Sequence, residues 1–322
     1  MGNRHNKIGI MMNISVIIPV YNAAAFLEKA VESALYFDEV KEILLIDDCS
    51  TDTSLQVCNY LVKKDSRVKL YQHPDKGNHG AAATRNLGLD MASQEFVAFL
   101  DADDYYLPNR FDAERIIFKD PEIEGVFGAI GVEFLSEKGK AEYNVKFNNS
   151  QLTTVRYSAE GKDVFRGLLN LTPDFFGTFF HLNTLTIRKA ALEKSKLKFN
   201  RSLRVHQDSD FIIKLAYHSF LKSGIINRAV AIRGVHDDNR ITKIKIYSRE
   251  YNLRQLSLWH SLYLWSKDNT LKHDEKKHLF LQFKAFEISQ KKGLKKVFNI
   301  ILSALRHPTI LKTRYRFTYM QK

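Results

Sequence analysis

Residues 96–104 read FVAFLDADD, an apolar run that leads directly into three aspartates. A short run rich in Phe, Val and Leu is typical of a strand that is buried on both faces of a sheet. Three carboxylates within four residues at the end of such a strand are electrostatically costly unless a cation or a basic partner lies beside them. The stretch therefore predicts a buried strand over 96–100 and a charged site at Asp101–Asp104.

Two interpretations of these aspartates stay open at this point. Hard cations such as Mg²⁺ and Mn²⁺ prefer carboxylate oxygens, and an Asp-x-Asp at a strand end supplies two of them. The alternative is a solvated acidic turn in which Asp104 caps a helix that begins after Tyr105.

Upstream of this stretch, apolar runs alternate with helical patterns. Strands are expected over Ser15–Val20, Glu42–Ile46 and Val68–Tyr71, and helices over Ala23–Tyr36, Ser54–Lys64 and Thr84–Ala92. Strands that alternate with helices indicate an α/β fold with a mainly parallel, doubly wound sheet. Because ligands bind at the carboxyl ends of parallel strands, we expect Pro19–Asn22, Asp47–Thr53 and Asp101–Asp104 to line one crevice.

The pattern is weaker downstream. Strands are expected over Gly125–Phe134, Leu182–Arg188 and Ile225–Ile232, and helices over Ala190–Lys194, Asp208–His218, Ser248–Trp265, Asp274–Gln290 and Lys291–Arg306. The aromatic segment Leu171–Leu185 (LTPDFFGTFFHLNTL) could stack on sugar rings or form part of the core.

Composition excludes several protein classes. A chain of 322 residues with 44% hydrophobic residues is not disordered, and two cysteines exclude a disulfide framework. No apolar run reaches about 18 residues, so no transmembrane helix is expected. Few cysteines and an N-terminus without a signal-peptide pattern predict a cytoplasmic location.

The positive charge is concentrated at the C-terminal end. From Ile241 onward the chain carries 18 of its 49 Lys and Arg residues but only 5 of its 36 Asp and Glu residues, which accounts for the whole net charge of +13. We therefore predict two regions, a catalytic domain over 1–240 and a basic, mainly helical region over 241–322.

Within the basic region, residues 291–306 (KKGLKKVFNIILSALR) place apolar side chains on one helical stripe behind four lysines. A helix of this kind can bind an anionic membrane surface. The alternative is that the stripe packs on the catalytic domain while the lysines are solvated. No nucleic-acid-binding motif accompanies the charge, so nucleic acid is not an expected partner.

Five ordered segments resemble glycosyltransferase family 2, the large inverting family with the GT-A fold. They are ISVIIPVYNAAAFLEKAVESAL (14–35), EILLIDDCSTDTS (42–54), GNHGAAATRNLGLDMASQEFVAFLDADDYYLP (77–108), NTLTIRKAALEK (183–194) and HQDSDFIIKLA (206–216). Each segment is weakly specific alone, but five in the expected order over residues 14–240 are strongly specific.

The resemblance implies a nucleotide site at the first strands. Pro19 and Tyr21 would border the base and ribose, and Asp48 would contact the base. Arg85 would face the base or the diphosphate, where a planar guanidinium suits either, although a surface arginine on a helix is the alternative. Asn22 is interpreted as the N-cap of the helix that follows it.

The resemblance also assigns the cation to the aspartates. Asp103 would be the direct ligand of Mn²⁺ or Mg²⁺, and Asp101 would lie nearer the ribose or a metal-bound water. Asp104 would support them or cap a helix. His236 follows the last expected strand, where similar enzymes carry a histidine near the metal, but a loop histidine without a role is an equal alternative.

Asp208 matches the general base that inversion requires, since it lies where the family carries a Glu-Asp pair. In this chain the Glu position is Gln207, a departure that puts the contacts around the base in doubt. A carboxylate in the first turn of a helix is also a common capping device. Asp210 is expected to be either structural or a neighbour of the acceptor.

The resemblance thus implies an inverting transfer of sugar from a nucleotide donor, expected to be a UDP-sugar, to a lipid-linked or cell-surface glycan acceptor. The enzyme would lie peripherally on the cytoplasmic face of the membrane through residues 241–322. One rival is a nucleotidyltransferase, which would be expected to have a Gly-rich phosphate loop that SVIIPVYN lacks. The other is a non-catalytic carbohydrate-binding or scaffold protein, which would be expected to have lost Asp48, Asp101, Asp103 or Asp208.

Overall fold

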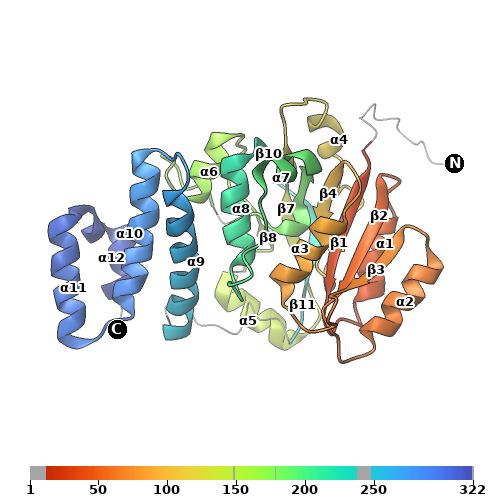
Figure 1. Ribbon diagram of the computed structural model, residues 1–322, viewed down its shortest axis with the longest axis horizontal. Coiled ribbons are helices and arrows are strands. Elements are labelled where there is room, and N and C mark those ends of the chain that lie inside the picture. The colour runs from red at the N-terminus through yellow and green to blue at the C-terminus, as the bar shows by residue number, and fades with distance from the viewer. Residues whose placement is uncertain (1–11, 148, 178, 238–247, 321–322) are drawn as a thin grey trace. The chain divides into compact units, whose positions relative to one another are not determined.

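The computed structural model describes residues 12–147, 149–177, 179–237 and 248–320. The chain divides into two compact units (Figure 1). The first comprises Met1–Arg201 and Phe211–Asp237, and the second Ser202–Asp210 and Asp238–Lys322. The functional division into 1–240 and 241–322 stays a prediction.

The first unit is built on a seven-stranded sheet of order β10-β6-β9-β4-β1-β2-β3. Its strands are β1 (Ile14–Val20), β2 (Val40–Asp47), β3 (Val68–Gln72), β4 (Phe96–Phe99), β6 (Gly125–Phe127), β9 (Leu185–Arg188) and β10 (Leu221–Ser223). All neighbouring pairs are parallel except the two that β9 makes with β4 and β6. This confirms the predicted α/β fold with a mainly parallel sheet.

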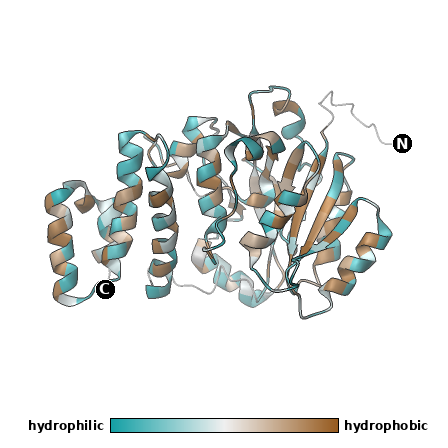
Figure 2. Ribbon diagram, in the orientation of Figure 1, coloured by the Kyte–Doolittle hydropathy of each residue, from teal (hydrophilic) through white to brown (hydrophobic). Residues whose placement is uncertain are grey.

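Helices cover both faces of this sheet, and β1 shows how. Its even-numbered residues pack in one core cluster with the buried side of α1 (Leu27–Leu35). Its odd-numbered Ile17 lies against Gly88 of α3 (Ala81–Met91) on the other face. Strands that are apolar on both sides need such a double cover, and Figure 2 shows the central strands as almost uniformly hydrophobic. The helix α2 (Ser54–Lys64) has the bounds that the sequence predicted.

A second, four-stranded sheet of order β5-β11-β7-β8 completes the unit. It contains β5 (Tyr105–Tyr106), β7 (Ala129–Phe134), β8 (Leu152–Thr153) and β11 (Ala229–Val235). The single strand predicted over Gly125–Phe134 is therefore wrong, because β6 and β7 belong to different sheets. The chain changes sheet at Gly128, where a Cβ atom would lie 3.0 Å from both the Ile225 carbonyl oxygen and a Val230 methyl group.

The other helices of the first unit are short. They are α4 (Glu114–Ile117), α5 (Glu137–Phe147), α6 (Lys162–Leu168), the 3₁₀ helix η1 (Leu182–Thr184) and α7 (Lys189–Ser195). The helix α8 (Gln207–His218) begins in the second unit and continues into the first. In the aromatic segment 171–185, Phe176 and Phe180 are buried, and Phe180 stacks on Phe127 with 4.0 Å between ring centroids. The core interpretation holds for these two rings.

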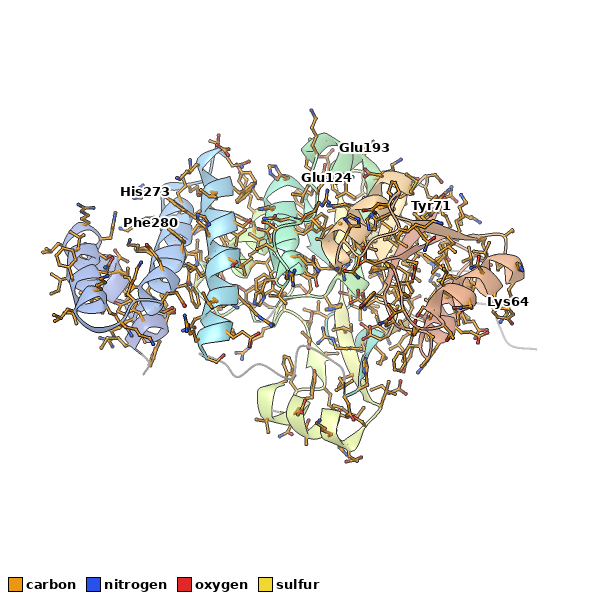
Figure 3. All side chains as sticks on the ribbon, turned by 60° about the horizontal axis from the view of Figure 1, so that its bottom comes forward. Lys64, Tyr71, Glu124, Glu193, His273 and Phe280 are labelled. Atoms are coloured by element: carbon orange, nitrogen blue, oxygen red, sulfur yellow. The ribbon has the colours of Figure 1, made fainter. Side chains whose placement is uncertain are left out.

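The second unit is helical. It contains α9 (Arg249–Lys267), α10 (His273–Ser289), α11 (Gly293–Arg306), the 3₁₀ helix η2 (Pro308–Leu311) and α12 (Thr313–Met320). Its small core joins α10, η2 and α12, and Phe280 of α10 packs against it (Figure 3). The three predicted helices are present, α12 was not predicted, and no helix among the described residues has the length and apolar character to cross a membrane.

The contact between α3 and β1 gives a test of the fold. A Cβ atom on Gly88 would lie 2.4 Å from Cγ2 of Ile17, which is fully buried. Gly88→Ala should therefore lower the free energy of unfolding by about 1–3 kcal/mol, although alanine is the better helix former. Urea denaturation would measure this change.

The matched control is the same substitution in an Ile17→Ala background, where the opposing side chain is gone. The cost of Gly88→Ala should then largely disappear, giving a large coupling energy in the double-mutant cycle. Equal costs in the two backgrounds would show that the contact does not limit packing.

Candidate functional site

The carboxyl ends of β1, β2 and β4 lie at one edge of the sheet, because the three strands are parallel neighbours. Pro19 and Tyr21 stand at the end of β1, Asp48 follows β2, and Asp101 follows β4. Tyr21 is 45% exposed and Pro19 is partly buried. The structure therefore brings these predicted residues to a common edge.

Asp48 is buried and holds the loop that leads into α3. Its two carboxylate oxygens accept hydrogen bonds from the backbone N–H groups of His79 (2.7 Å) and Gly80 (2.8 Å). Its backbone oxygen accepts a third from the Asn78 side chain (2.9 Å). The contact of Asp48 with a nucleotide base stays a prediction, and any such contact would be made by a carboxylate that already orders this loop.

Asn22 does not cap the helix that follows it, so that prediction is wrong. The N-cap of α1 is Phe26, and Asn22 has a left-handed backbone with φ of 50°. Its side-chain oxygen instead accepts a hydrogen bond from the backbone N–H of Thr51 (2.7 Å), in the loop after β2. Asn22 thus ties together two of the loops at the sheet edge.

Arg85 lies in α3 and is buried, so the alternative of a surface arginine is wrong. One terminal nitrogen of its guanidinium donates a hydrogen bond to Oδ1 of Asp101 at 2.7 Å. The guanidinium also lies over the Phe199 ring, 5.6 Å from its centroid. A positive charge is therefore fixed beside the first aspartate of the acidic turn.

His236 and Asp103, both predicted to lie near the metal, are neighbours in the structure. His236 follows β11, and its Nε2 is 3.3 Å from Oδ2 of Asp103. Its ring stacks on Phe26, with 4.9 Å between centroids. A histidine that follows a strand of the second sheet thus lies beside the acidic turn that follows β4 of the first sheet.

Asp104 differs from its neighbours because it is buried and bonded on both oxygens. Oδ1 accepts a hydrogen bond from the backbone N–H of Gly234 (3.0 Å), and Oδ2 accepts one from the side-chain amide of Asn183. The strand β5, and not a helix, follows directly at Tyr105. The solvated turn with Asp104 as a helix cap is therefore wrong.

His181 and Asn183 are site residues that the sequence did not reveal. They stand at the start of β9, which runs antiparallel to β4 and therefore begins where β4 ends. Besides holding Asp104, Asn183 accepts a hydrogen bond from the backbone N–H of Asp101 (3.1 Å). Nε of the buried Arg110 donates to the Asn183 carbonyl (2.9 Å), which fixes this short turn.

The pKa values show how the cluster distributes its charge. Burial would raise the pKa of Asp101, but the charged Arg85 beside it outweighs burial, and the pKa lies below its usual range. Burial, together with the negative charges of Asp103 and Asp101, raises the pKa of Asp104 well above its usual range. Burial and Arg233 lower the pKa of His181 to about 3, so this imidazole is neutral.

The donor set fits a divalent cation. One carboxylate oxygen each of Asp101 and Asp104 lie within 4.8 Å of each other and of a nitrogen of His181. The carboxylates are the ligands that Mn²⁺ and Mg²⁺ prefer, whereas His181 lies beside them as a neighbour. Nδ1 of His181 accepts the Asn183 backbone N–H at 3.3 Å, so Nε2 carries the proton of the neutral ring. His181 is thus set up to donate a hydrogen bond to an anionic oxygen.

Comparison with known proteins decides the family. Residues 15–182 match the family described as glycosyl transferase family 2, more than half of the chain. This chain belongs to glycosyl transferase family 2. It is a glycosyltransferase, as the ordered segments predicted.

Two curated family members illustrate the relationship. An uncharacterized glycosyltransferase of Haemophilus influenzae is 41% identical over 103 residues, which are 31% of this chain and 40% of that protein. The GalNAc(5)-diNAcBac-PP-undecaprenol beta-1,3-glucosyltransferase of Campylobacter jejuni is 28% identical over 212 residues, 61% of this chain and 65% of that enzyme. The chain spans less than two thirds of either relative.

Solved glycosyltransferases share the GT-A fold. TarS 1–349 of S. aureus, in complex with UDP-GlcNAc, has a TM-score of 0.61 and 19% identity over 96% of this chain and 84% of that one. The mannosyltransferase PcManGT of Pyrobaculum calidifontis, in complex with GDP-Man and Mn²⁺, has a TM-score of 0.53 and 17% identity over 97% and 84%. At these identities the likeness establishes the fold.

In this family 2 glycosyltransferase, Asp208 lies in the first turn of α8, within the second unit, and its role as the base stays a prediction. Asp210, two residues later, is fully buried and accepts a hydrogen bond from the Ser261 hydroxyl at 2.7 Å. Asp210 therefore has the structural contact that was expected of it.

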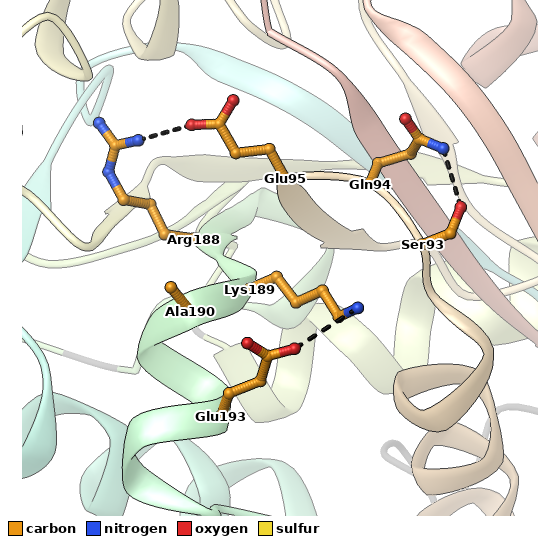
Figure 4. A pocket seen from close by; sticks show the side chains of 7 residues that line it. All are labelled: Ser93, Gln94, Glu95, Arg188, Lys189, Ala190 and Glu193. Carbon is orange, nitrogen blue, oxygen red and sulfur yellow. Dashed lines mark hydrogen bonds and ion pairs between the residues drawn. The ribbon is translucent and has the colours of Figure 1, made fainter.

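A surface hollow of about 350 Å³ lies away from the acidic turn (Figure 4). It is lined by Ser93, Gln94, Glu95, Arg188, Lys189, Ala190 and Glu193. These residues surround the start of β4 and the end of β9, the edge of the sheet opposite Asp101. Arg188 pairs with Glu95 (2.9 Å) and Lys189 with Glu193 (3.5 Å), so the charges are matched within the hollow.

Asn183 gives a test of how the acidic turn is held. Asn183→Leu removes both the amide that holds Asp104 and the acceptor for Asp101, so Mn²⁺ affinity should fall about 10–100-fold. Isothermal titration with Mn²⁺ would measure it. The control is Thr184→Val, which removes a buried hydroxyl that donates to the Gly128 and His181 carbonyls. Equal losses in the two variants would mean that Asn183 has only a structural role.

The pKa of Asp104 predicts how cation binding depends on pH. Because this pKa is raised, the metal-free carboxyl keeps its proton above the usual range, and a cation bound beside it would favour the loss of that proton. Mn²⁺ affinity should therefore rise with pH, by up to about tenfold per pH unit below the raised pKa. The neutral His181 contributes nothing above its pKa of about 3.

Titrations of the wild type, Asp104→Asn and His236→Gln between about pH 5 and pH 7 would measure this. We expect Asp104→Asn to bind more weakly and to lose most of the slope, and His236→Gln to keep it. A slope that only His236→Gln removes would assign the proton to the histidine.

Proposed function

We propose that this glycosyltransferase moves a sugar, with inversion, from a nucleoside diphosphate donor to a hydroxyl of a lipid-linked or cell-surface glycan. The observation that carries the proposal is the convergence of Asp101, Asp103, Arg85 and His181 at one sheet edge, where a diphosphate needs opposite charge and hydrogen-bond donors. The acceptor class is supported by the C. jejuni relative, whose name gives a PP-undecaprenol acceptor.

The donor is proposed to be a UDP-sugar. The solved neighbour with the higher TM-score holds UDP-GlcNAc, whereas PcManGT, with the lower score, holds GDP-Man. Pro19, Tyr21 and Asp48 would receive the base and ribose at the ends of β1 and β2. The partly exposed Tyr21 ring offers a face for stacking.

Bound Mn²⁺ or Mg²⁺ would neutralise charge on the leaving diphosphate, held by Asp103 with Asp101 and His236. The Arg85 guanidinium is already fixed at Asp101 and would orient the diphosphate beside it. Nε2–H of His181 would donate a hydrogen bond to a leaving oxygen. None of these contributions by the protein needs a proton transfer, because Arg85 stays charged and His181 stays neutral throughout.

The acceptor step needs one base. Asp208 would take the proton of the acceptor hydroxyl while its oxygen attacks the anomeric carbon, and the bond from that carbon to the phosphate oxygen breaks on the opposite face. The products are the glycoside with inverted configuration and the nucleoside diphosphate. Gln207 lacks the charge of the usual Glu, so Asp208 would act without an adjacent carboxylate.

We also propose that the enzyme works peripherally on the cytoplasmic face of the membrane. A lipid-linked acceptor of the kind named for the C. jejuni enzyme is confined to the bilayer. The basic region 241–322 carries the net charge of +13 that an anionic surface would attract.

A donor screen tests the chemistry. Nucleotide-sugar hydrolysis and transfer would be measured with and without Mn²⁺ for the wild type, Asp103→Ala and Asp208→Asn. Asp103→Ala should abolish the metal dependence of donor binding, whereas Asp208→Asn should keep donor binding and lower kcat for transfer about 10²–10⁴-fold.

Ser209→Ala, in the same helical turn, is the matched control and should transfer like the wild type. Unimpaired transfer by Asp208→Asn would remove the proposed base, and donor binding that ignores both Mn²⁺ and Asp103 would remove the proposed metal site. A protein that binds no nucleotide-sugar would instead fit the non-catalytic alternative.

A further inference from the structure

The helix α11 exposes its apolar stripe. Five large side chains along one face of the helix lie in solvent, with exposed fractions from 52% for Val297 to 87% for Leu294. They are Leu294, Val297, Phe298, Ile301 and Leu305. At about 100° per residue they occupy an arc of about 100° on the helix surface. Figure 2 shows hydrophobic and hydrophilic residues alternating along α11, as this pattern requires.

A different face of α11 makes its packing contacts. Ile300 and Ala304 lie against the core of the second unit, and Ser303 is buried beside them. The partners of this inner face come from α10, η2 and α12 and include Leu281, Ile310 and Tyr319. The helix is therefore anchored without its stripe. Within the second unit, the stripe is therefore not used for packing.

Positive charges border the stripe. Lys291, Lys292, Lys295 and Lys296 lie at the start of the helix, and Arg306 at its end. Lys295 and Arg306 project at about 100–120° from the centre of the stripe, on the side away from the packed face. No Asp or Glu occurs between residues 291 and 306. This charge distribution favours an anionic partner and opposes a basic one.

We infer that the exposed face of α11 is the surface that inserts into an anionic bilayer. A single convex helix with long apolar side chains and a cationic flank matches the interface between lipid head groups and acyl chains. The core of a protein interface, by contrast, is depleted in charge and enriched in Tyr and Trp, both of which the stripe lacks. This inference rests on the proposed membrane location and names the element responsible for it.

Vesicle flotation tests the inference on the full chain. Wild-type protein should float with vesicles of phosphatidylcholine and phosphatidylglycerol, and its affinity for pure phosphatidylcholine should be at least about tenfold lower. The triple variant Leu294→Ser, Phe298→Ser, Leu305→Ser should lose flotation, and Lys292→Gln with Lys295→Gln should lose the preference for anionic lipid. The substituted side chains are all exposed, three in the triple variant and two in the lysine variant. The melting temperatures of both variants should therefore stay close to that of the wild type.

Val145→Ser is the matched control. Val145 is 89% exposed on α5 but has no comparable stripe around it, so its removal should leave flotation unchanged. Flotation of the triple variant at the wild-type level would overturn the inference. A wild-type protein that ignores vesicles but dimerises in a stripe-dependent way would also overturn it, with a second copy as the partner.

Donor hydrolysis measured in the same samples separates the two proposals. A triple variant that hydrolyses donor normally and does not float supports docking through α11. A protein that floats through α11 but hydrolyses no donor would leave the docking surface standing and would contradict the proposed reaction.

Discussion

The burial of Asp104 beside the partly buried Asp101 and Asp103 is the constraint on which the arrangement of this protein depends. Carboxylates that are removed from water need a positive charge or hydrogen-bond donors beside them. Here each of these groups comes from a different part of the chain. Arg85 comes from α3, Asn183 from the turn before β9, and the Gly234 N–H from the second sheet. The acidic turn thus ties both sheets and one covering helix to the end of β4.

The aspartates have different pKa values because different groups stabilise their carboxylates. Asp101 faces a guanidinium and keeps a low pKa, whereas Asp104 is held mainly by neutral donors and has a raised pKa. The neutral His181 adds a hydrogen-bond donor without adding charge. The metal-free site is therefore less negative than three ionised carboxylates would be. A cation bound beside Asp104 would favour the loss of its proton, and the donors Arg85 and His181 are already in place for a diphosphate of the kind proposed.

Apolar periodicity was sufficient to predict β1, β2, β3 and β4 of the first sheet, because β1, β2 and β4 are apolar and buried and their ends carry the polar residues. It could not predict that β9 runs antiparallel, since strand direction depends on the long connection after β4 and leaves no local pattern. For that reason His181 and Asn183 were missed, although Asn183 lies in the predicted strand Leu182–Arg188 and His181 directly before it. The first three residues of that segment form η1, and only Leu185–Arg188 form β9. The burial of Arg85 and the change of sheet at Gly128 likewise depend on tertiary packing.

The exposed stripe of α11 also has a kinetic consequence. An enzyme held on a bilayer by one helix meets a lipid-linked acceptor by lateral diffusion in two dimensions. Confinement of both molecules to one surface raises their effective concentration without any new contact between them. The rate of transfer then follows the number of acceptor molecules per unit of membrane area. Adding inert lipid would slow such an enzyme even at a constant amount of acceptor in the sample.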